Sequence, residues 1–344
     1  MEYYKLNKSN IDKFIAELGK GYAVYAPVNR DGITSFEHLA EGESPNMDFL
    51  LTQKPAKEVF YPQTEVLLRF DGDKTTPSKY DGGPIAIFGV RPCDARGFKI
   101  VEKVFVDDRY KDFYWLARRK DSLVIAVGCN SPLRECFCNW VGGGPFDATG
   151  ADILAVDIGE EYILEPITEA GKNALSAISF LEKAEQIDID KIEAVQAKSR
   201  ESLPEPPELD DFKACLDSLF DDPFWNEITA KCLGCAVCTF SCPTCYCFDI
   251  QDETRRGKGV RLRIWDTCQF PIFTKEGSGH NPRKSQMSRL RQRYMHKFSY
   301  MIETIGEFGC VGCGRCVAAC PVNIDIREFI IKALETARQK GAAS

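Results

Sequence analysis

Cysteines dominate the chemistry that this sequence can support. The chain of 344 residues contains 16 cysteines and only 3 histidines, so sites built from thiolates alone are favoured over zinc or copper sites. Half of the cysteines form two runs of one pattern, C-x-x-C-x-x-C-x-x-x-C-P, whose spacing lets thiolates converge on an iron–sulfur cubane. The runs are Cys232, Cys235, Cys238 and Cys242 before Pro243, and Cys310, Cys313, Cys316 and Cys320 before Pro321. We therefore expect two [4Fe-4S] clusters, with structural zinc as the alternative.

The two runs are expected to exchange their last cysteines. In two-cluster ferredoxins the fourth cysteine of each run ligates the other cluster. Gly234, Gly312 and Gly314 lie between the cysteines, where a glycine lets the backbone approach a cluster closely. The exchange makes the two clusters neighbours. It assigns Cys232, Cys235, Cys238 and Cys320 to cluster 1, and Cys310, Cys313, Cys316 and Cys242 to cluster 2.

A further group of cysteines lies in the N-terminal half, outside these runs. Cys93 and Cys129 each follow a short apolar run that is rich in β-branched residues. If the two runs are neighbouring parallel strands, both thiols emerge at the carboxyl edge of one sheet. The loop after Cys129 then returns the other cysteines to that edge. We interpret Cys93, Cys129, Cys136 and Cys138 as ligands of a third [4Fe-4S] cluster. Inert buried thiols, a zinc site and a redox switch are the alternatives.

The remaining cysteines, Cys215, Cys245, Cys247 and Cys268, fit no ligand pattern. Cys245 and Cys247 come just after the first run, and we interpret them as small apolar side chains that pack beside cluster 2. Ligation is the alternative for this pair.

Positive charge gathers between the two runs although the whole chain is acidic. The net charge is −7, while residues 255–263 and 281–297 are rich in arginine and lysine. Arg289, Arg293 and Lys297 recur every four residues, which places them on one stripe of a helix. We interpret the stripe as a docking surface or as charge compensation for anionic clusters, with a solvated helix face as the alternative. We expect no nucleic acid partner, because a cluster domain has a simpler use for these cations.

The elements that position these cysteines differ between the two halves of the chain. The N-terminal half predicts an α/β domain over residues 1–200, with a helix at 10–19 and strands or hairpins separated by turn residues. The strands are expected at 22–27, 65–70, 84–90 and 122–128, with a hairpin at 151–166. A proline-rich acidic linker follows at 201–211. Residues 212–344 predict a mainly α-helical, two-cluster ferredoxin-like domain with little sheet.

Composition excludes several classes of protein. The sequence has no apolar run near the roughly 20 residues of a membrane span, and its N-terminus lacks the apolar centre of a signal peptide. We therefore expect a cytoplasmic protein without a membrane span. In such a reducing compartment the cysteines are not expected to form disulfides.

Several longer strings resemble a known family. They are similar to the two-cluster electron-transfer component that anaerobic sulfite reductase and the beta subunit of cytoplasmic sulfhydrogenase have in common. In the C-terminal half the strings are SCPTCYCFDIQDE (241–253), RIWDTCQFPIFT (263–274), GHNPR (279–283), RLRQRYMHKF (289–298) and GCVGCGRCVAACPVNIDI (309–326). In the N-terminal half they are FGVRPCDARG (88–97), DRYKDFYWLARR (108–119) and GCNSPLRECFCNWVGGGPFD (128–147).

The resemblance implies an iron–sulfur relay in an anaerobic redox complex rather than an independent catalyst. In that family the protein relays electrons between a flavin- and nicotinamide-binding diaphorase and a terminal siroheme reductase or hydrogenase, each of which is a separate subunit. No G-x-G-x-x-G follows a strand in this chain, so we expect flavin and nicotinamide to bind elsewhere. We identify no catalytic residues.

Other functions stay open at this point. Related subunits also occur in heterodisulfide-reductase-like and electron-bifurcating complexes. A disulfide-type reductase with its own substrate site at the N-terminal cysteines is a second alternative. A scaffold with purely structural clusters is a third.

Overall fold

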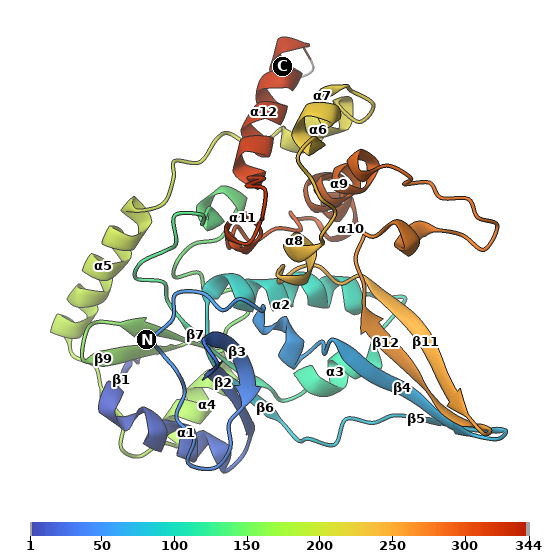
Figure 1. Ribbon diagram of the computed structural model, residues 1–344. Helices are drawn as coiled ribbons and strands as arrows, with labels where there is room; N and C mark the ends of the chain where they lie inside the picture. The colour runs from blue at the N-terminus through green and yellow to red at the C-terminus, as the bar shows by residue number, and fades with distance from the viewer. Residues whose placement is uncertain (1, 342–344) are drawn as a thin grey trace. The chain divides into compact units, whose positions relative to one another are not determined.

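The apolar runs of the N-terminal half form a mixed sheet of eight strands, in the order β10-β1-β9-β8-β7-β6-β2-β3 (Figure 1). The computed structural model describes residues 2–341. The strands are β1 (Tyr4–Asn7), β2 (Ala23–Arg30), β3 (Ile33–His38), β6 (Ile85–Val90), β7 (Leu123–Val127), β8 (Ile153–Asp157), β9 (Glu161–Pro166) and β10 (Glu182–Lys183). Strands β2, β6, β7 and β8 are parallel, and the edge strands pair antiparallel. The predicted parallel neighbours β6 and β7 and the hairpin β8–β9 are confirmed.

Helices cover both faces of this sheet, because every residue of β6 and β7 is buried. The helices are α1 (Ile11–Gly19), α2 (Pro92–Phe105), α3 (Phe113–Arg119), α4 (Glu169–Ser176) and α5 (Gln186–Glu201), with short 3-10 turns η1 (Lys8–Asn10), η2 (Ala56–Val59) and η3 (Cys138–Val141). Helices α1 and α4 share one apolar core with the strands, in which the rings of Phe14 and Phe88 lie 5.9 Å apart. Helix α2 packs against β7 from the side opposite α1 (Figure 1).

These elements make the first of two units into which the chain divides. The first unit holds residues 2–61, 79–204 and 311–313, and the second holds 62–78, 205–310 and 314–341. The segment at 62–78 therefore belongs to the second unit, although the sequence analysis placed the strand at 65–70 in the N-terminal domain.

The second unit contains a four-stranded antiparallel sheet in the order β11-β12-β4-β5. The strands are β4 (Thr64–Asp71), β5 (Lys74–Pro77), β11 (Phe248–Arg255) and β12 (Lys258–Trp265). Every residue of β11 is exposed, so the strand is held by backbone pairing and carries no alternating apolar pattern. A turn at Arg256 and Gly257, both with positive φ, joins it to β12. The expectation of little sheet in this half was wrong for that reason.

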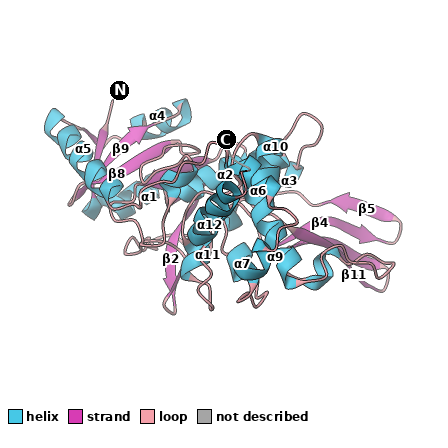
Figure 2. Ribbon diagram, turned by 90° about the horizontal axis from the view of Figure 1, so that it is seen from above, coloured by secondary structure: helices cyan, strands magenta, loops and turns pink. Residues whose placement is uncertain are grey.

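The helices of the second unit pack through an aromatic core. They are α6 (Phe212–Ser218), α7 (Phe224–Thr229), α8 (Val237–Phe240), α9 (Gln286–Met295), α10 (Met301–Ile305), α11 (Arg315–Ala318) and α12 (Ile326–Gln339), with a 3-10 turn η4 (Pro271–Thr274) and a π-helical turn η5 (His296–Tyr300) (Figure 2). Tyr294 and Phe329 stack with ring centroids 4.0 Å apart, and Trp225 stacks on Phe329 at 5.6 Å. This core fixes one side of α9. No described helix is long and apolar enough to cross a membrane.

Candidate iron–sulfur cluster sites

The first cysteine run wraps a small pocket just before and within α8. Gly234 and Ala236 adopt positive φ values of 67° and 66°, and these turn the loop around the pocket. Cys320, the last cysteine of the second run, lines the same pocket, as does Cys316. The structure therefore brings together the whole set predicted for cluster 1, which is Cys232, Cys235, Cys238 and Cys320.

Two N–H groups point at sulfur atoms of this set. The side-chain amide of Gln286 donates to Sγ of Cys232 at 3.2 Å, and the backbone N–H of Ile324 donates to Sγ of Cys320 at 3.2 Å. Hydrogen bonds of this kind stabilise thiolates and tune the potential of a cluster that they ligate. The donors therefore suit an anionic cluster.

Arg293 lies at the wall of the same pocket with its guanidinium inside the protein. It is only 3% exposed, and Nη2 donates to the carbonyl oxygen of Cys238 at 3.1 Å. Burial lowers the pKa of Arg293, but the charges of Cys238 and Cys316 raise it, and the net direction is upward. Within the described part of the chain, Nε is buried and has no hydrogen-bond acceptor. An orphaned cationic N–H beside a pocket of thiols is a feature that a bound anionic cluster would satisfy.

The last cysteine of the first run meets a buried lysine instead. Nζ of Lys297 lies 3.2 Å from Sγ of Cys242, 3.0 Å from Oγ1 of Thr244 and 2.7 Å from the carbonyl oxygen of Gly309. Thr244 also donates to Gly309 at 2.7 Å. A hydrogen bond from Cys245 lowers the pKa of Cys242, burial raises it and Lys297 lowers it again, with a net downward direction. Cys242 is thereby tied to the residue that precedes Cys310.

The cluster 2 set is not gathered around one pocket as the cluster 1 set is. Cys242 and Cys310 both lie near the buried ammonium of Lys297. Cys316 lines the pocket of the first run, and Cys313 belongs to the first unit. The complete cluster 2 set therefore stays a prediction from the sequence.

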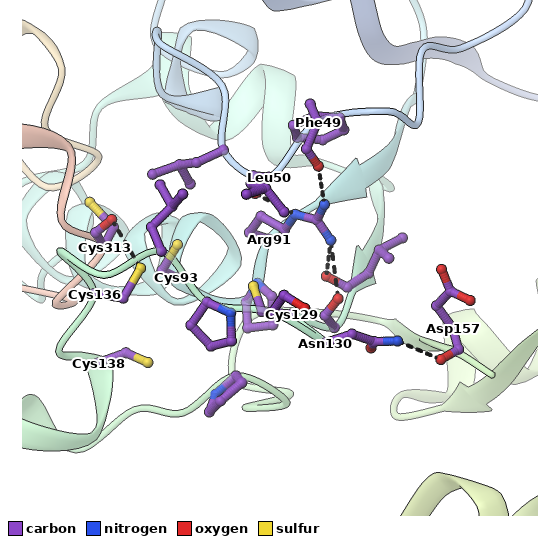
Figure 3. A pocket seen from close by; sticks show the side chains of 18 of the residues that line it. Phe49, Leu50, Arg91, Cys93, Cys129, Asn130, Cys136, Cys138, Asp157 and Cys313 are labelled. Atoms are coloured by element: carbon purple, nitrogen blue, oxygen red, sulfur yellow. Dashed lines mark hydrogen bonds between the residues drawn. The ribbon is translucent and has the colours of Figure 1, made fainter. Parts of the chain in front are cut away.

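The N-terminal cysteines surround a cavity of about 430 Å³ in the first unit (Figure 3). Cys93 is the second residue of α2, directly after β6, and Cys129 follows the end of β7. The loop between β7 and β8 brings back two more thiols, so that the cavity is lined by Cys93, Cys129, Cys136, Cys138 and Cys313. Burial raises the pKa of Cys138 to about 12, and the charges of Cys129 and Cys136 contribute to the rise.

Backbone contacts hold the thiol loop against the segment at 311–313. The N–H of Phe137 donates to the carbonyl oxygen of Gly312 at 2.8 Å, and Sγ of Cys136 lies 3.7 Å from the carbonyl oxygen of Cys313. Gly312 has a φ of 62°, and a Cβ on it would lie 2.5 Å from the backbone of Phe137. Only glycine therefore allows this close approach.

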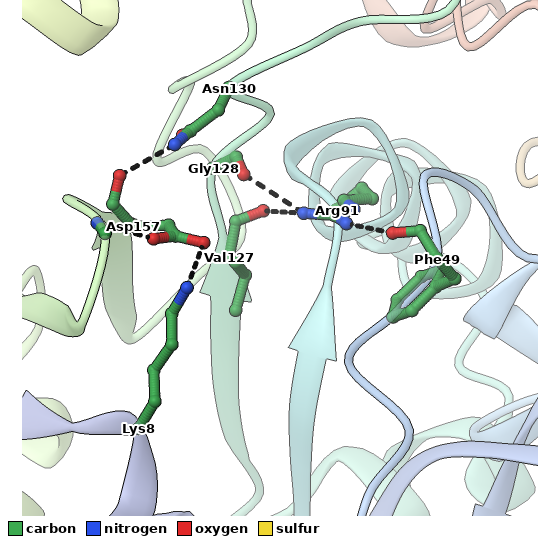
Figure 4. A network of polar contacts seen from close by, with 8 residues as sticks. Lys8, Phe49, Arg91, Val127, Gly128, Asn130 and Asp157 are labelled. Atoms are coloured by element: carbon green, nitrogen blue, oxygen red, sulfur yellow. Dashed lines mark hydrogen bonds and ion pairs between the residues drawn. The ribbon is translucent and has the colours of Figure 1, made fainter.

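Arg91 fixes the other side of the cavity (Figure 4). This side chain is 9% exposed; Nε donates to the carbonyl oxygen of Leu50 at 3.0 Å, and Nη2 donates to that of Phe49 at 2.5 Å. Nη1 donates to the carbonyl oxygen of Gly128 at 3.0 Å, one residue before Cys129. Arg91 therefore joins the ends of β6 and β7 to the loop that covers them.

Single-ion geometry is a different matter from cluster geometry. Among residues 2–341, no group of three or more His, Cys, Asp or Glu side chains is arranged to hold one metal ion. A zinc site needs four ligands within about 2.3 Å of one ion, whereas a cubane holds its four thiolates on four separate irons. The donor sets present therefore fit clusters better than single ions.

Comparison with known proteins agrees with this chemistry. A protein-family model described as a 4Fe-4S dicluster domain matches residues 231–324, which hold both cysteine runs. Sulfhydrogenase 2 subunit beta of Pyrococcus furiosus is 28% identical over 327 residues, which cover 94% of this chain and 96% of that protein. The chain belongs to the family of 4Fe-4S electron-transfer subunits. No solved structure matches it.

The basic stripe of this 4Fe-4S electron-transfer subunit is not on its surface. Arg289, Arg293 and Lys297 are 7%, 3% and 2% exposed, so the interpretations as a docking surface and as a solvated face were wrong. The stripe is the buried side of α9 and η5, because the helix turns this side toward the cysteine loops. Charge compensation is the interpretation that agrees with the contacts of Arg293 and Lys297.

Sequence reasoning missed three polar side chains of this electron-transfer subunit. Arg91, Thr244 and Gln286 each contact a cysteine, its neighbouring peptide or a lysine beside it. Arg91 and Thr244 each lie two residues from a cysteine, which was the one available signal. Gln286 had no such signal, since its contact with Cys232 spans 54 positions.

Proposed function

We propose that this protein relays single electrons through two [4Fe-4S] clusters whose ligand sets exchange their last cysteines. The observation that carries the proposal is that Cys320 lines the same pocket as the first three cysteines of the other run. The reciprocal contact supports it, since Lys297 and Thr244 tie Cys242 to Gly309. Two runs interlocked in this way hold both sites in one rigid framework.

The chain's residues supply what one-electron chemistry at such sites requires. A bound [4Fe-4S] cluster takes up and releases one electron with little change of shape. Thiolates ligate it, the amides of Gln286 and Ile324 donate to sulfur, and Arg293 and Lys297 offset negative charge. No residue of this framework is placed to act on a substrate, which favours a relay.

Access to the cluster 1 site is available from solvent. Cys235 is exposed, and Leu233 beside it has 68% of its surface exposed. Cys242 and Lys297, in contrast, are buried. Electron transfer falls off with distance, so we infer that a partner docks near Cys235 and exchanges electrons with cluster 1.

A third [4Fe-4S] cluster at Cys93, Cys129, Cys136 and Cys138 belongs to the same proposal. Support comes from their convergence on one cavity, and from the presence of Cys313 in its lining. Cys313 is also a proposed ligand of cluster 2, so an electron would pass from the N-terminal site to cluster 2 through this segment. Inert thiols, zinc and a redox switch remain the competing assignments.

Partners follow from the relay role and from the relative. The proposed donor or acceptor is a flavin- and nicotinamide-binding diaphorase subunit, because this chain has no binding motif of its own for either cofactor. The name of the sulfhydrogenase relative favours a hydrogenase as the terminal subunit over a siroheme reductase. Membership of a heterodisulfide-reductase-like or electron-bifurcating complex is the alternative.

A disulfide-type reductase with its own substrate site is the second candidate function. The cavity of about 430 Å³ favours it, because the cavity extends past the thiols to Leu51, Ser131 and Tyr162. The two functions predict different behaviour of the isolated protein. A relay accepts electrons but turns over no substrate alone, whereas the reductase cleaves a disulfide when supplied with reductant.

Anaerobic purification under native conditions tests the relay. Mass spectrometry of the co-purifying chains is expected to find a diaphorase and a nickel–iron or siroheme subunit. The isolated protein should be reduced by dithionite and should return the electrons to a dye acceptor. Disulfide turnover by the isolated protein at a rate comparable with its reduction would contradict the relay.

A further inference from the structure

Two buried cations stand one helical turn apart, and each contacts a different cysteine site. Arg293 lies near the end of α9 and Lys297 in the π-helical turn η5. Arg293 donates to the carbonyl oxygen of Cys238, and Lys297 donates to the sulfur of Cys242. On the proposed ligand sets, Cys238 belongs to cluster 1 and Cys242 to cluster 2.

Neither cation has a carboxylate partner among the described residues. The three polar atoms within reach of Nζ of Lys297 are the sulfur of Cys242, the hydroxyl of Thr244 and the carbonyl oxygen of Gly309. Only the sulfur can carry a negative charge at neutral pH. A lone buried ammonium costs several kcal/mol, so its counter-charge must come from the thiolate and whatever the thiolate ligates.

The π-helical turn explains how Lys297 is held in this position. In the turn, the N–H of Met301 donates to the carbonyl oxygen of His296, five residues earlier. The carbonyl oxygen of Lys297 accepts from the N–H of Gly309 at 2.7 Å, and Nζ donates to the carbonyl oxygen of Gly309 at the same distance. Backbone and side chain of Lys297 thus both grip the residue before Cys310, and the ammonium cannot swing away.

We propose that Lys297 and Arg293 set the reduction potentials of the two clusters separately, with Lys297 acting on cluster 2 and Arg293 on cluster 1. The inference rests on the proposed function. Reduction adds one negative charge to a cluster, and a fixed cation nearby stabilises the reduced form, which raises its potential. Because the interaction weakens with distance, each cation acts mainly on the cluster that it touches.

The effect of Lys297 is the larger of the two. Its ammonium reaches a ligand sulfur at 3.2 Å, whereas the nearest contact of Arg293 is a backbone carbonyl at 3.1 Å, with the charge spread over the guanidinium. Removing the charge of Lys297 should therefore lower the potential of cluster 2 more than removing that of Arg293 lowers cluster 1.

Redox titration of the anaerobic full-length protein, followed by EPR, tests the inference. The variants are Lys297→Gln and Arg293→Gln, which remove the charge but keep an N–H donor, and Lys297→Arg, which keeps the charge. Arg291→Gln is the matched control, because it removes a charge from the same helix at a side chain that contacts Phe220 and no cysteine. Cys320→Ser and Cys242→Ser assign the two signals.

In Lys297→Gln, the reduced-to-oxidised ratio of cluster 2 should fall at least tenfold at fixed potential, a shift of about 59 mV for one electron. Cluster 1 should be unmoved, and Lys297→Arg should restore cluster 2. Arg293→Gln should show the reverse selectivity, and Arg291→Gln should move neither. Equal shifts of both clusters, or no shift in either, would overturn the inference.

Loss of iron is the other outcome to be read. If Lys297→Gln loses about half of the iron while the cluster 1 signal keeps its potential, the specific link to cluster 2 stands, and Lys297→Arg should recover both iron and potential. Loss of all iron in Lys297→Gln would show a general structural role and reject the inference. A wild-type protein without reducible clusters would instead reject the proposed function.

Discussion

The N–H of Phe137 donates to the carbonyl oxygen of Gly312 at 2.8 Å, across 175 positions of the chain. Phe137 stands between two thiols of the N-terminal cavity, and Gly312 precedes Cys313. One backbone hydrogen bond thus connects the loop of the proposed third cluster with the segment of a proposed cluster 2 ligand. The relay depends on this approach, because it sets the spacing between the two thiol groups.

Replacing Gly312 with alanine should open this contact. A Cβ there would lie 2.5 Å from the backbone of Phe137 and Cys138, in addition to the strain of a positive φ. Gly306→Ala is the control, since Gly306 has a φ of 79° and nothing within 4 Å of the added Cβ. Gly306→Ala should cost about 1 kcal/mol of stability, and Gly312→Ala clearly more. Urea unfolding under anaerobic conditions measures both; equal midpoints would show that the contact is unimportant.

Cys129→Ser and Cys136→Ser should remove one cluster and leave two. The wild-type protein should hold about twelve irons per chain, and either variant about eight. Cys215→Ser is the control, because Cys215 is buried in α6 and lines neither of the thiol-bearing cavities described above. Iron and sulfide analysis of anaerobically purified protein gives the counts. About eight irons in the wild type itself would mean that the N-terminal thiols hold no cluster.

The ion pair between Arg263 and Glu65 should matter more than a similar pair on the same sheet. Both side chains are 4% exposed and face each other across β12 and β4. Asp252 and Arg261 pair on β11 and β12 at 2.7 Å but are 42% and 45% exposed. Glu65→Ala should cost about 3–5 kcal/mol, because it leaves a buried guanidinium without its partner. Asp252→Ala should cost about 1 kcal/mol or less. Similar unfolding midpoints for the two variants would contradict this account of the sheet.

His296 should make the protein less stable in mild acid. Burial lowers its pKa to about 4, with the charges of Lys297 and Arg283 adding to the effect, and its Nε2 lies 3.1 Å from the hydroxyl of Tyr246. The folded state therefore favours the neutral ring. The stability that this provides is complete above pH 6.5 and is lost as the pH falls from about 6.5 to 4, by up to roughly 3 kcal/mol.

His296→Gln supplies the comparison for that prediction. The amide keeps a polar partner for Tyr246 and does not titrate, so the difference between wild type and variant isolates the histidine. Urea midpoints at pH 7.5 and pH 5.0 should converge at the lower pH. A constant difference between the two proteins would show that His296 is not held neutral.

The positions of the N-terminal thiols could be predicted because two local signals agree. The runs that became β6 and β7 are wholly apolar, which is typical of central parallel strands, and a cysteine follows each of them. Since parallel strands end at the same edge, the convergence of Cys93 and Cys129 follows from topology alone. The spacing of the ferredoxin-type runs is similarly local, so the pocket of the first run could be expected.

Features that depend on long-range packing could not be predicted. Strand β4 pairs with β12, nearly 200 positions away, and the all-exposed β11 has no apolar period to reveal it. The stripe of Arg289, Arg293 and Lys297 was visible as a periodicity, but periodicity does not say which side of a helix is buried. That side is set by the stacking of Tyr294 on Phe329, a contact between distant segments.

The exchanged pair of clusters is tested most directly by an EPR-monitored redox titration of the anaerobic protein and its Cys320→Ser variant. The wild type should show two reducible [4Fe-4S] signals from the C-terminal runs. In Cys320→Ser, the signal perturbed should be the one that the Cys232→Ser variant also perturbs, because both residues line one pocket. If Cys320→Ser instead perturbs the same signal as Cys310→Ser, each run ligates its own cluster and the interlocked relay is contradicted.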